Sequence, residues 1–214
     1  LFAHGQPRRV LIIGGGDGGL LREVVKHRSV EHVTQVEIDA AVVDMAKTWF
    51  PDHSRGAFDD PRFHLVIADG AEFVRTAEDS WDAILIDSTD PIGPGEALFS
   101  NAFYRHCERI LTPGGVMVTQ NGVPFMQLDE VTKTARGFRD LFADWHFYGV
   151  AVPTYIGGMM TLGWATQDAG LRTQPVDVLE ERFAAAAIDT RYYTPAIHGA
   201  AFALPRFVLE AIGK

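Results

Sequence analysis

The stretch VLIIGGGDGG, which spans Val10–Gly19, decides the fold. Its first four residues are apolar and predict a buried strand, and the apolar residues over positions 20–25 follow with helical spacing. Between them, Gly14, Gly16 and Gly19 match the pattern G-x-G-x-x-G. A loop of this pattern between a strand and a helix binds a nucleotide or nucleoside at the helix N-terminus. A glycine-rich turn with a solvated aspartate is the alternative.

The rest of the chain alternates strands with helices. We expect strands over 32–38, 63–67, 83–86 and 116–120, and helices over 42–49, 101–111 and 128–142. Two aromatic-rich runs, 145–152 and 159–165, are expected to pair as antiparallel strands, and helices over 176–187 and 200–212, the latter interrupted by Pro205, complete the chain. This order predicts a doubly wound α/β fold, with a mostly parallel, seven-stranded sheet and antiparallel final strands, as one domain over residues 1–214. The arrangement is Rossmann-like and typical of the methyltransferase-type variant rather than of dehydrogenases.

The composition limits the partners. The 214 residues include 28 acidic side chains against 19 lysines and arginines, for a net charge of -9. The basic residues are scattered, so no nucleic-acid partner is predicted. No apolar run approaches the roughly 20 residues that cross a bilayer, so no membrane partner is predicted either. The one cysteine, Cys107, fits a reducing cytoplasm, and the histidines lack paired ligand spacing, so no metal site is expected.

A second stretch, DSTDPIGP over Asp87–Pro94, carries the candidate chemistry. It follows the strand at 83–86 and places Asp87 and Asp90 on a loop that two prolines and a glycine keep stiff. In an open parallel sheet the carboxyl ends of the strands form the edge where ligands bind. Neither acid has a basic neighbour in sequence. Such a pair suits holding a cationic amine and accepting its proton.

Acidic residues also end the other parallel strands. Asp17 follows the first strand, Glu37 ends the second, and Asp69 with Gly70 closes the third. Glu37 can accept hydrogen bonds from the two hydroxyls of a ribose. Asp69 can accept from an adenine amino group, although an Asp-Gly pair is more often only a turn. Four carboxylates on one rim, with Asp87, predict a site for positive charge and coupled pKa values.

Asp17 distinguishes a nucleoside from a dinucleotide. A nicotinamide dinucleotide would place its pyrophosphate close to this carboxylate, at a cost of several kcal/mol in a low-dielectric crevice. A nucleoside without phosphates, carrying a sulfonium or an amine, would instead be attracted. Tyr155, in a loop that reads PTYIGG, is a candidate ligand contact or a packed tyrosine with about equal weight. Tyr192, Tyr193 and Phe202 are expected to be core or interface aromatics.

Together these motifs resemble the polyamine aminopropyltransferase family, of the bacterial spermidine synthase type. The resemblance covers essentially the whole chain, and the GGGDGG and DxxDPxGP motifs are its most specific parts. The residue ranges that carry it are 10–19, 36–39, 69–70, 87–94, 113–115, 153–155 and 191–198.

The resemblance implies transfer of an aminopropyl group from decarboxylated S-adenosylmethionine to putrescine, giving spermidine and methylthioadenosine. The donor is a co-substrate, and no tightly bound cofactor is implied. Asp87 would accept the proton, while Asp90 and Tyr155 would position putrescine. Asp17 would hold the donor's ammonium, Glu37 the ribose and Asp69 with Gly70 the adenine. The implied donor-binding residues are Gly14, Gly16, Asp17, Gly19, Glu37, Asp69, Gly70 and Pro94.

Members of this family carry a β-rich segment before the glycine loop, and they form dimers or larger homo-oligomers. The chain begins at Leu1, after the position of that segment, so we expect part of the substrate lid to be missing. Two alternatives stay open. One is a non-catalytic relative that binds a nucleoside or polyamine, and the other is an S-adenosylmethionine-dependent methyltransferase.

Overall fold

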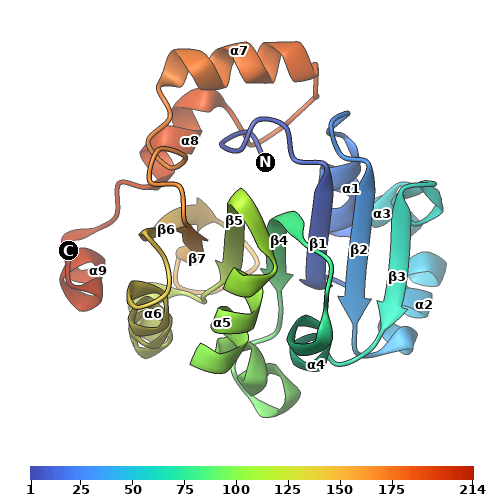
Figure 1. Ribbon diagram of the computed structural model, residues 1–214, viewed down its shortest axis with the longest axis horizontal. Helices are drawn as coiled ribbons and strands as arrows, with labels where there is room; N and C mark the ends of the chain where they lie inside the picture. The colour runs from blue at the N-terminus through green and yellow to red at the C-terminus, as the bar shows by residue number, and fades with distance from the viewer.

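A seven-stranded sheet forms the centre of the protein, in a computed structural model that describes all 214 residues. The strand order is β3-β2-β1-β4-β5-β7-β6 (Figure 1). The strands are β1 (Arg9–Gly14), β2 (His32–Glu37), β3 (Phe63–Ile67), β4 (Trp81–Asp87), β5 (Leu111–Gln120), β6 (Asp144–Ala151) and β7 (Met159–Thr166).

The first five strands are parallel, and β7 pairs antiparallel with both β5 and β6. This confirms the predicted doubly wound sheet with an antiparallel end. The strand order reverses between β1 and β4, which is the position where open α/β sheets bind ligands. There Gly14 lies in register with Asp87. The two stretches that the sequence singled out are therefore neighbours at one edge of the sheet.

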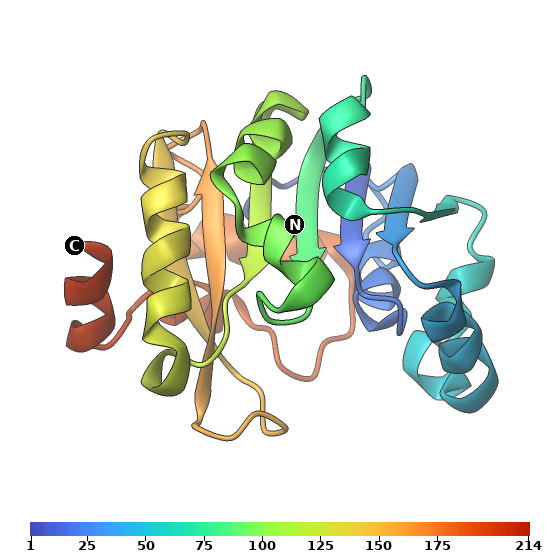
Figure 2. The same cartoon turned by 90° about the horizontal axis from the view of Figure 1, so that it is seen from below.

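Helices cover both faces. They are α1 (Gly19–Val25), α2 (Ala40–Trp49), α3 (Pro51–Ser54), α4 (Gly70–Thr76), α5 (Asn101–Arg109), α6 (Pro124–Arg139), α7 (Val176–Ala186), α8 (Pro195–Ala201) and α9 (Arg206–Ile212), with 3₁₀ turns η1 (Ala57–Asp59) and η2 (Gly93–Phe99). Helix α9, near the C-terminus, lies beside α6 in both views (Figures 1 and 2). No helix is long and apolar enough to cross a membrane.

Alternate side chains of β1 point into two separate cores, as the two-residue period of a strand requires. Leu11 and Ile13 pack with residues from α4, α5 and α6. Val10 and Ile12 pack with residues from α1 and from the chain after β7. The apolar run VLII is therefore buried on both faces, which explains why it is continuous rather than alternating.

The largest differences between predicted and observed boundaries concern β5, α6 and α8. The strand expected over 116–120 begins five residues earlier, at Leu111, because β5 pairs with β4 on both sides of a register shift between Trp81 and Ala83. Helix α6 begins at Pro124, four residues before the predicted start, because proline is favoured in the first turn. The helix expected over 200–212 is interrupted at Pro205 as predicted, but its first part, α8, begins earlier, at Pro195, because Thr194 caps it by accepting a 3.1 Å bond from the Ile197 amide.

Candidate active site

The glycine loop brings the backbone close to two carboxylates. Gly14 has a φ of +81°, and a Cβ atom there would overlap the carbonyl oxygen of Asp87. That carbonyl accepts a hydrogen bond from the Gly15 amide at 3.0 Å. A Cβ on Gly16 would lie 2.8 Å from Glu37 Oε2. Glycine is required at position 14, where the φ is positive and a side chain would displace the Asp87 backbone, and a side chain at position 16 would push the Glu37 carboxylate aside.

Asp17 lies at the start of α1 and is partly engaged by the protein itself. Its Oδ1 accepts a hydrogen bond from the Gly19 amide at 2.8 Å, and its Oδ2 lies 3.2 Å from His53 Nε2. The side chain is 59% exposed. It therefore faces solvent, where a charged ligand group can reach it. The His53 contact joins the glycine loop to α3, 36 positions further along the chain, and no local pattern indicates it.

Glu37 ends β2 as a buried carboxylate, with 8% of the residue exposed. Its Oε1 accepts from the Asp39 amide at 3.1 Å, which leaves Oε2 directed toward the glycine loop. Gln35, two residues earlier, donates from Nε2 to the carbonyls of Gly14 and Gly15 at 2.8 and 2.7 Å. This buried glutamine fixes the loop on β2, and sequence reasoning did not identify it.

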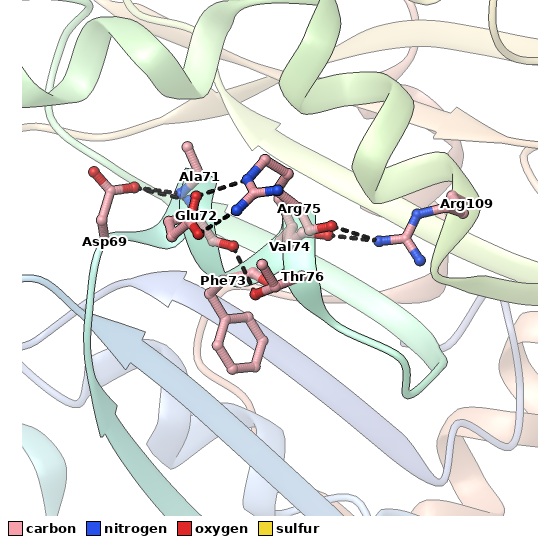
Figure 3. A network of polar contacts seen from close by, with 8 residues as sticks. All are labelled: Asp69, Ala71, Glu72, Phe73, Val74, Arg75, Thr76 and Arg109. Carbon is pink, nitrogen blue, oxygen red and sulfur yellow. Dashed lines mark hydrogen bonds and ion pairs between the residues drawn. The ribbon is translucent and has the colours of Figure 1, made fainter.

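Asp69 caps α4 (Figure 3). Its Oδ1 accepts from the amides of Ala71 and Glu72 at 2.8 and 3.0 Å. Gly70 is the first residue of the helix and packs against Ile13. One carboxylate oxygen of Asp69 is thus used to hold the turn, and the other has no bonded partner within the protein. Its contact with an adenine stays a prediction.

Asp87 is the most electrostatically perturbed acid of the rim. Its side chain is exposed at the cavity that it lines, and the protein atoms around it still desolvate the carboxylate enough to raise its pKa. The charges of Asp17 and Glu37 raise the pKa further. No lysine or arginine pairs with it. Asp87 is consequently a carboxylate with a greater tendency to hold a proton than an ordinary surface aspartate.

Asp90 is held by two amides rather than by a cation. Gln127 Nε2 donates to Oδ2 at 3.0 Å, and Gln120 Nε2 lies 3.5 Å from Oδ1. Gln120 comes from the carboxyl end of β5 and Gln127 from α6. Both glutamines lie far from Asp90 in sequence, so only the folded chain reveals them as its partners.

A cavity of about 620 Å³ joins Asp87 to Tyr155. Of its 29 lining residues 22 are hydrophobic, and Gln120 is one of the few polar ones. Tyr155 lies on the connection between β6 and β7 and is 49% exposed. Tyr192, Tyr193 and Phe202 line the same cavity, so these aromatics border the site as well as packing.

The structure thus gathers the predicted residues in two groups that meet at Asp87. The glycine loop, Asp17 and Glu37 lie on one side, and Tyr155 lies on the other, together with Gln120, which the sequence analysis did not single out. Pro94 is on the exposed turn η2 and lines neither side directly.

Outside this arrangement, neither the cysteine nor a metal-binding cluster offers a second reactive site. Cys107 is fully buried, and burial raises the pKa of its thiol, which disfavours the reactive thiolate. No group of three or more histidine, cysteine, aspartate or glutamate side chains is placed to hold a metal ion.

Comparison with known proteins places the chain in a family. The family described as the spermine/spermidine synthase domain matches residues 1–175. A Pseudomonas aeruginosa protein named polyamine aminopropyltransferase 1 is 62% identical over 214 residues, which is 100% of this chain and 75% of the relative. The polyamine aminopropyltransferase of Pseudomonas syringae pv. tomato is 59% identical, with 100% and 75% of the two chains covered.

Solved structures give the same result. A spermidine synthase in complex with the transition state analogue AdoDATO superposes with a TM-score of 0.92 and 38% identity, over 99% of this chain and 71% of that one. The spermidine synthase from Thermotoga maritima superposes with a TM-score of 0.88 and is 36% identical, over 99% of this chain and 70% of that one. On its motifs, its sheet topology and these similarities, the chain belongs to the spermine/spermidine synthase family and is an aminopropyltransferase-type enzyme.

Proposed function

We propose that this protein transfers the aminopropyl group of decarboxylated S-adenosylmethionine to putrescine, giving spermidine and methylthioadenosine. The observation that carries the proposal is Asp87, a carboxylate without a cationic partner that stands between the glycine loop and the cavity. The names of its close relatives support the same reaction class.

On the donor side, the proposed contacts are acidic and suit a cationic nucleoside. Glu37 would accept from the ribose hydroxyls, and the free oxygen of Asp69 from the adenine amino group. Asp17, exposed at the head of α1, would attract the donor's ammonium. The carboxylate of intact S-adenosylmethionine would be repelled there, which favours the decarboxylated donor over a methyl donor.

The reaction is an in-line displacement at carbon. The amine nitrogen of putrescine forms a bond to the carbon attached to sulfur, the carbon–sulfur bond breaks, and its electron pair converts the sulfonium to a neutral thioether. The leaving group needs no acid. Catalysis therefore consists of orientation and removal of a proton from the attacking amine.

Asp87 is the proposed proton acceptor. An alkyl ammonium has a pKa of about 10 and is protonated at neutral pH, so a nearby carboxylate must take or relay its proton. The raised pKa of Asp87 makes the protonated form of this acid more accessible than for an ordinary aspartate. Asp90 and Tyr155 would hold the acceptor in line with the donor carbon, Asp90 from the loop after β4 and Tyr155 from the lining of the cavity.

The test is release of methylthioadenosine from decarboxylated S-adenosylmethionine and putrescine by the purified protein. We expect spermidine and methylthioadenosine in equal amounts, and no transfer when S-adenosylmethionine replaces the donor. Tight nucleoside binding without product would contradict the proposal and favour a non-catalytic relative. Methyl transfer to an acceptor would contradict the role of Asp17.

The cytoplasmic location and the homo-oligomeric assembly also stay proposals. The single, buried cysteine supports a reducing compartment. Exposed apolar side chains on one face of α2, Met45 and Trp49, support a subunit contact, because such patches mark interfaces.

A further inference from the structure

The two amides that hold Asp90 do not hold it equally. Gln127 accepts a bond from the Val123 amide through Oε1 at 2.9 Å, so its Nε2 is committed to Asp90. To make both contacts, Gln127 leaves helical geometry, with φ -126° and ψ 37°, and α6 bends at that residue. The bend therefore places the Gln127 side chain where it can hold Asp90.

Glu130 lies just beyond the bend and is buried without a partner. Only 8% of the residue is exposed, and its Oε1 is closed to solvent and accepts no hydrogen bond. The charge of Asp90 acts on it directly. A buried polar atom without a hydrogen-bond partner lowers the stability of the protein, so Glu130 is expected to have a role other than stabilising the fold.

Neighbouring buried polar groups are, by contrast, matched. Thr134, one turn further along α6, accepts from Asn121 Nδ2 at 2.8 Å and shares a 3.1 Å bond with the Tyr104 hydroxyl. Gln120 repeats the pattern of Glu130, because it is 6% exposed, lines the cavity and leaves its Oε1 without a partner. Two of the buried acceptors that lack a partner, Glu130 Oε1 and Gln120 Oε1, thus belong to residues that interact with Asp90.

No cation of the protein reaches this cluster. The titratable groups that interact with Glu130 are Asp90, on the loop after β4, and Tyr104, on α5. Lys133 and Arg136, on the same helix, line a separate groove with Glu96. On the adjoining elements, Arg139 donates to the Ile212 carbonyl of α9, and Lys214 to the Trp145 carbonyl of β6.

We propose that Glu130 is a positioning residue for the amine acceptor, whose carboxyl group adds a second negative charge behind Asp90 and thereby selects an acceptor with a second ammonium. The inference rests on the proposed function, because it assigns a role within the acceptor site. In this arrangement Gln127 orients Asp90, and Asp90 contacts an ammonium group of the acceptor. The negative charge of Glu130 adds to that of Asp90 and compensates the positive charge of the diamine.

A proton must leave when the diamine binds. Burial, and then the charge of Asp90, raise the pKa of Glu130 to about 7, so near neutral pH a large share of the free enzyme carries a proton there. An incoming ammonium favours the ionised form. Binding of the diamine is therefore linked to proton release, and the KM for putrescine should rise as the pH falls below 7.

The experiment compares Glu130→Gln with Asp129→Asn, a control that removes the same charge from the neighbouring, exposed position of α6. For Glu130→Gln we expect a roughly tenfold higher KM for putrescine with kcat changed less than about twofold, because the charge contributes to binding rather than to the chemical step. The KM of this variant should no longer rise below pH 7. Inhibition by 1-aminobutane, which has one ammonium, should be the same in wild type and variant.

Calorimetry in two buffers of different ionisation enthalpy gives a second readout. Wild type should release close to one proton per putrescine bound at pH 6, and Glu130→Gln close to none. Equal KM values for Glu130→Gln and wild type, or an equal loss for putrescine and 1-aminobutane, would overturn the proposal. Absence of turnover in the wild-type enzyme would instead reject the proposed function, so the two failures are distinguishable.

Discussion

At the scale of single residues, the site is a set of carboxylates that the fold brings together without compensating cations. Asp17, Glu37 and Asp87 interact closely enough that the first two raise the pKa of the third. Such repulsion destabilises the empty protein and is relieved when a cationic ligand binds. The acidic rim is therefore explained by what it binds and not by what it contributes to the fold.

Asp87→Asn tests this at one position. We expect kcat to fall at least about a hundredfold, because the variant cannot accept the proton. The raised pKa means that ionised Asp87 opposes folding, an effect that is absent below its usual pKa of about 4 and grows as the pH rises through the folded-state value. The variant should thus melt at a higher temperature than wild type at pH 7 but not at pH 3.5.

Methylthioadenosine binding, measured by calorimetry, is the control for Asp87→Asn, since the donor contacts lie elsewhere and should survive. Unchanged turnover would remove Asp87 from its proposed role.

At the scale of elements, α4 shows how a short helix can position a site residue. Asp69 caps its first turn, and Arg109 of α5 donates to the carbonyls of Val74 and Arg75 near its other end (Figure 3). Arg109 also donates to the carbonyl of Ala77. A helix of seven residues is too short to be stable alone. Both ends are instead satisfied by side chains, which fixes where Asp69 stands.

Asp69→Ala and Asp69→Asn test how much the Asp69 cap contributes to the stability of α4. The alanine variant should lose about 1 kcal/mol of unfolding free energy, because two amides of α4 lose their acceptor. The asparagine variant keeps an oxygen that caps and should stay within a few tenths of a kcal/mol of wild type. Urea unfolding measures both, and equal stability of the two variants would show that the cap contributes nothing.

At the scale of the whole molecule, a partly buried ion pair fastens the antiparallel end of the sheet. Asp144, at the start of β6, accepts from Arg172 Nε and Nη2 at 2.9 and 2.8 Å and from Trp164 Nε1 at 3.2 Å. These contacts join β6, β7 and the chain that leads to α7. Removing the arginine would leave a carboxylate with 10% of its side chain exposed and no counter-charge.

Arg172→Ala should therefore lower the free energy of unfolding by about 3 kcal/mol. The matched control is Arg206→Ala, which breaks the exposed pair with Glu210 and should change stability by less than about 0.5 kcal/mol. Thermal and urea unfolding measure the difference. Similar losses in the two variants would mean that the Asp144 pair is worth no more than a surface pair.

The sequence by itself determined the strand–loop–helix at Val10–Gly19, the parallel sheet and the acids at the strand ends. Those features follow from patterns within a few residues: a continuous apolar run, glycine spacing and the position of an acid after a strand. Boundaries failed where a tertiary contact overrode the local signal, as in β5, whose pairing with β4 continues past Gly114.

Only the tertiary structure decided what surrounds those acids. His53 beside Asp17, Gln35 under the glycine loop, and Gln127 with Glu130 behind Asp90 each join segments about 20 to 40 residues apart. No periodicity encodes such pairs, because they depend on how the helices pack on the sheet. The same packing bends α6 at Gln127 and buries most of Glu130, and this burial, together with the charge of Asp90, raises the pKa of an ordinary helical glutamate to about 7.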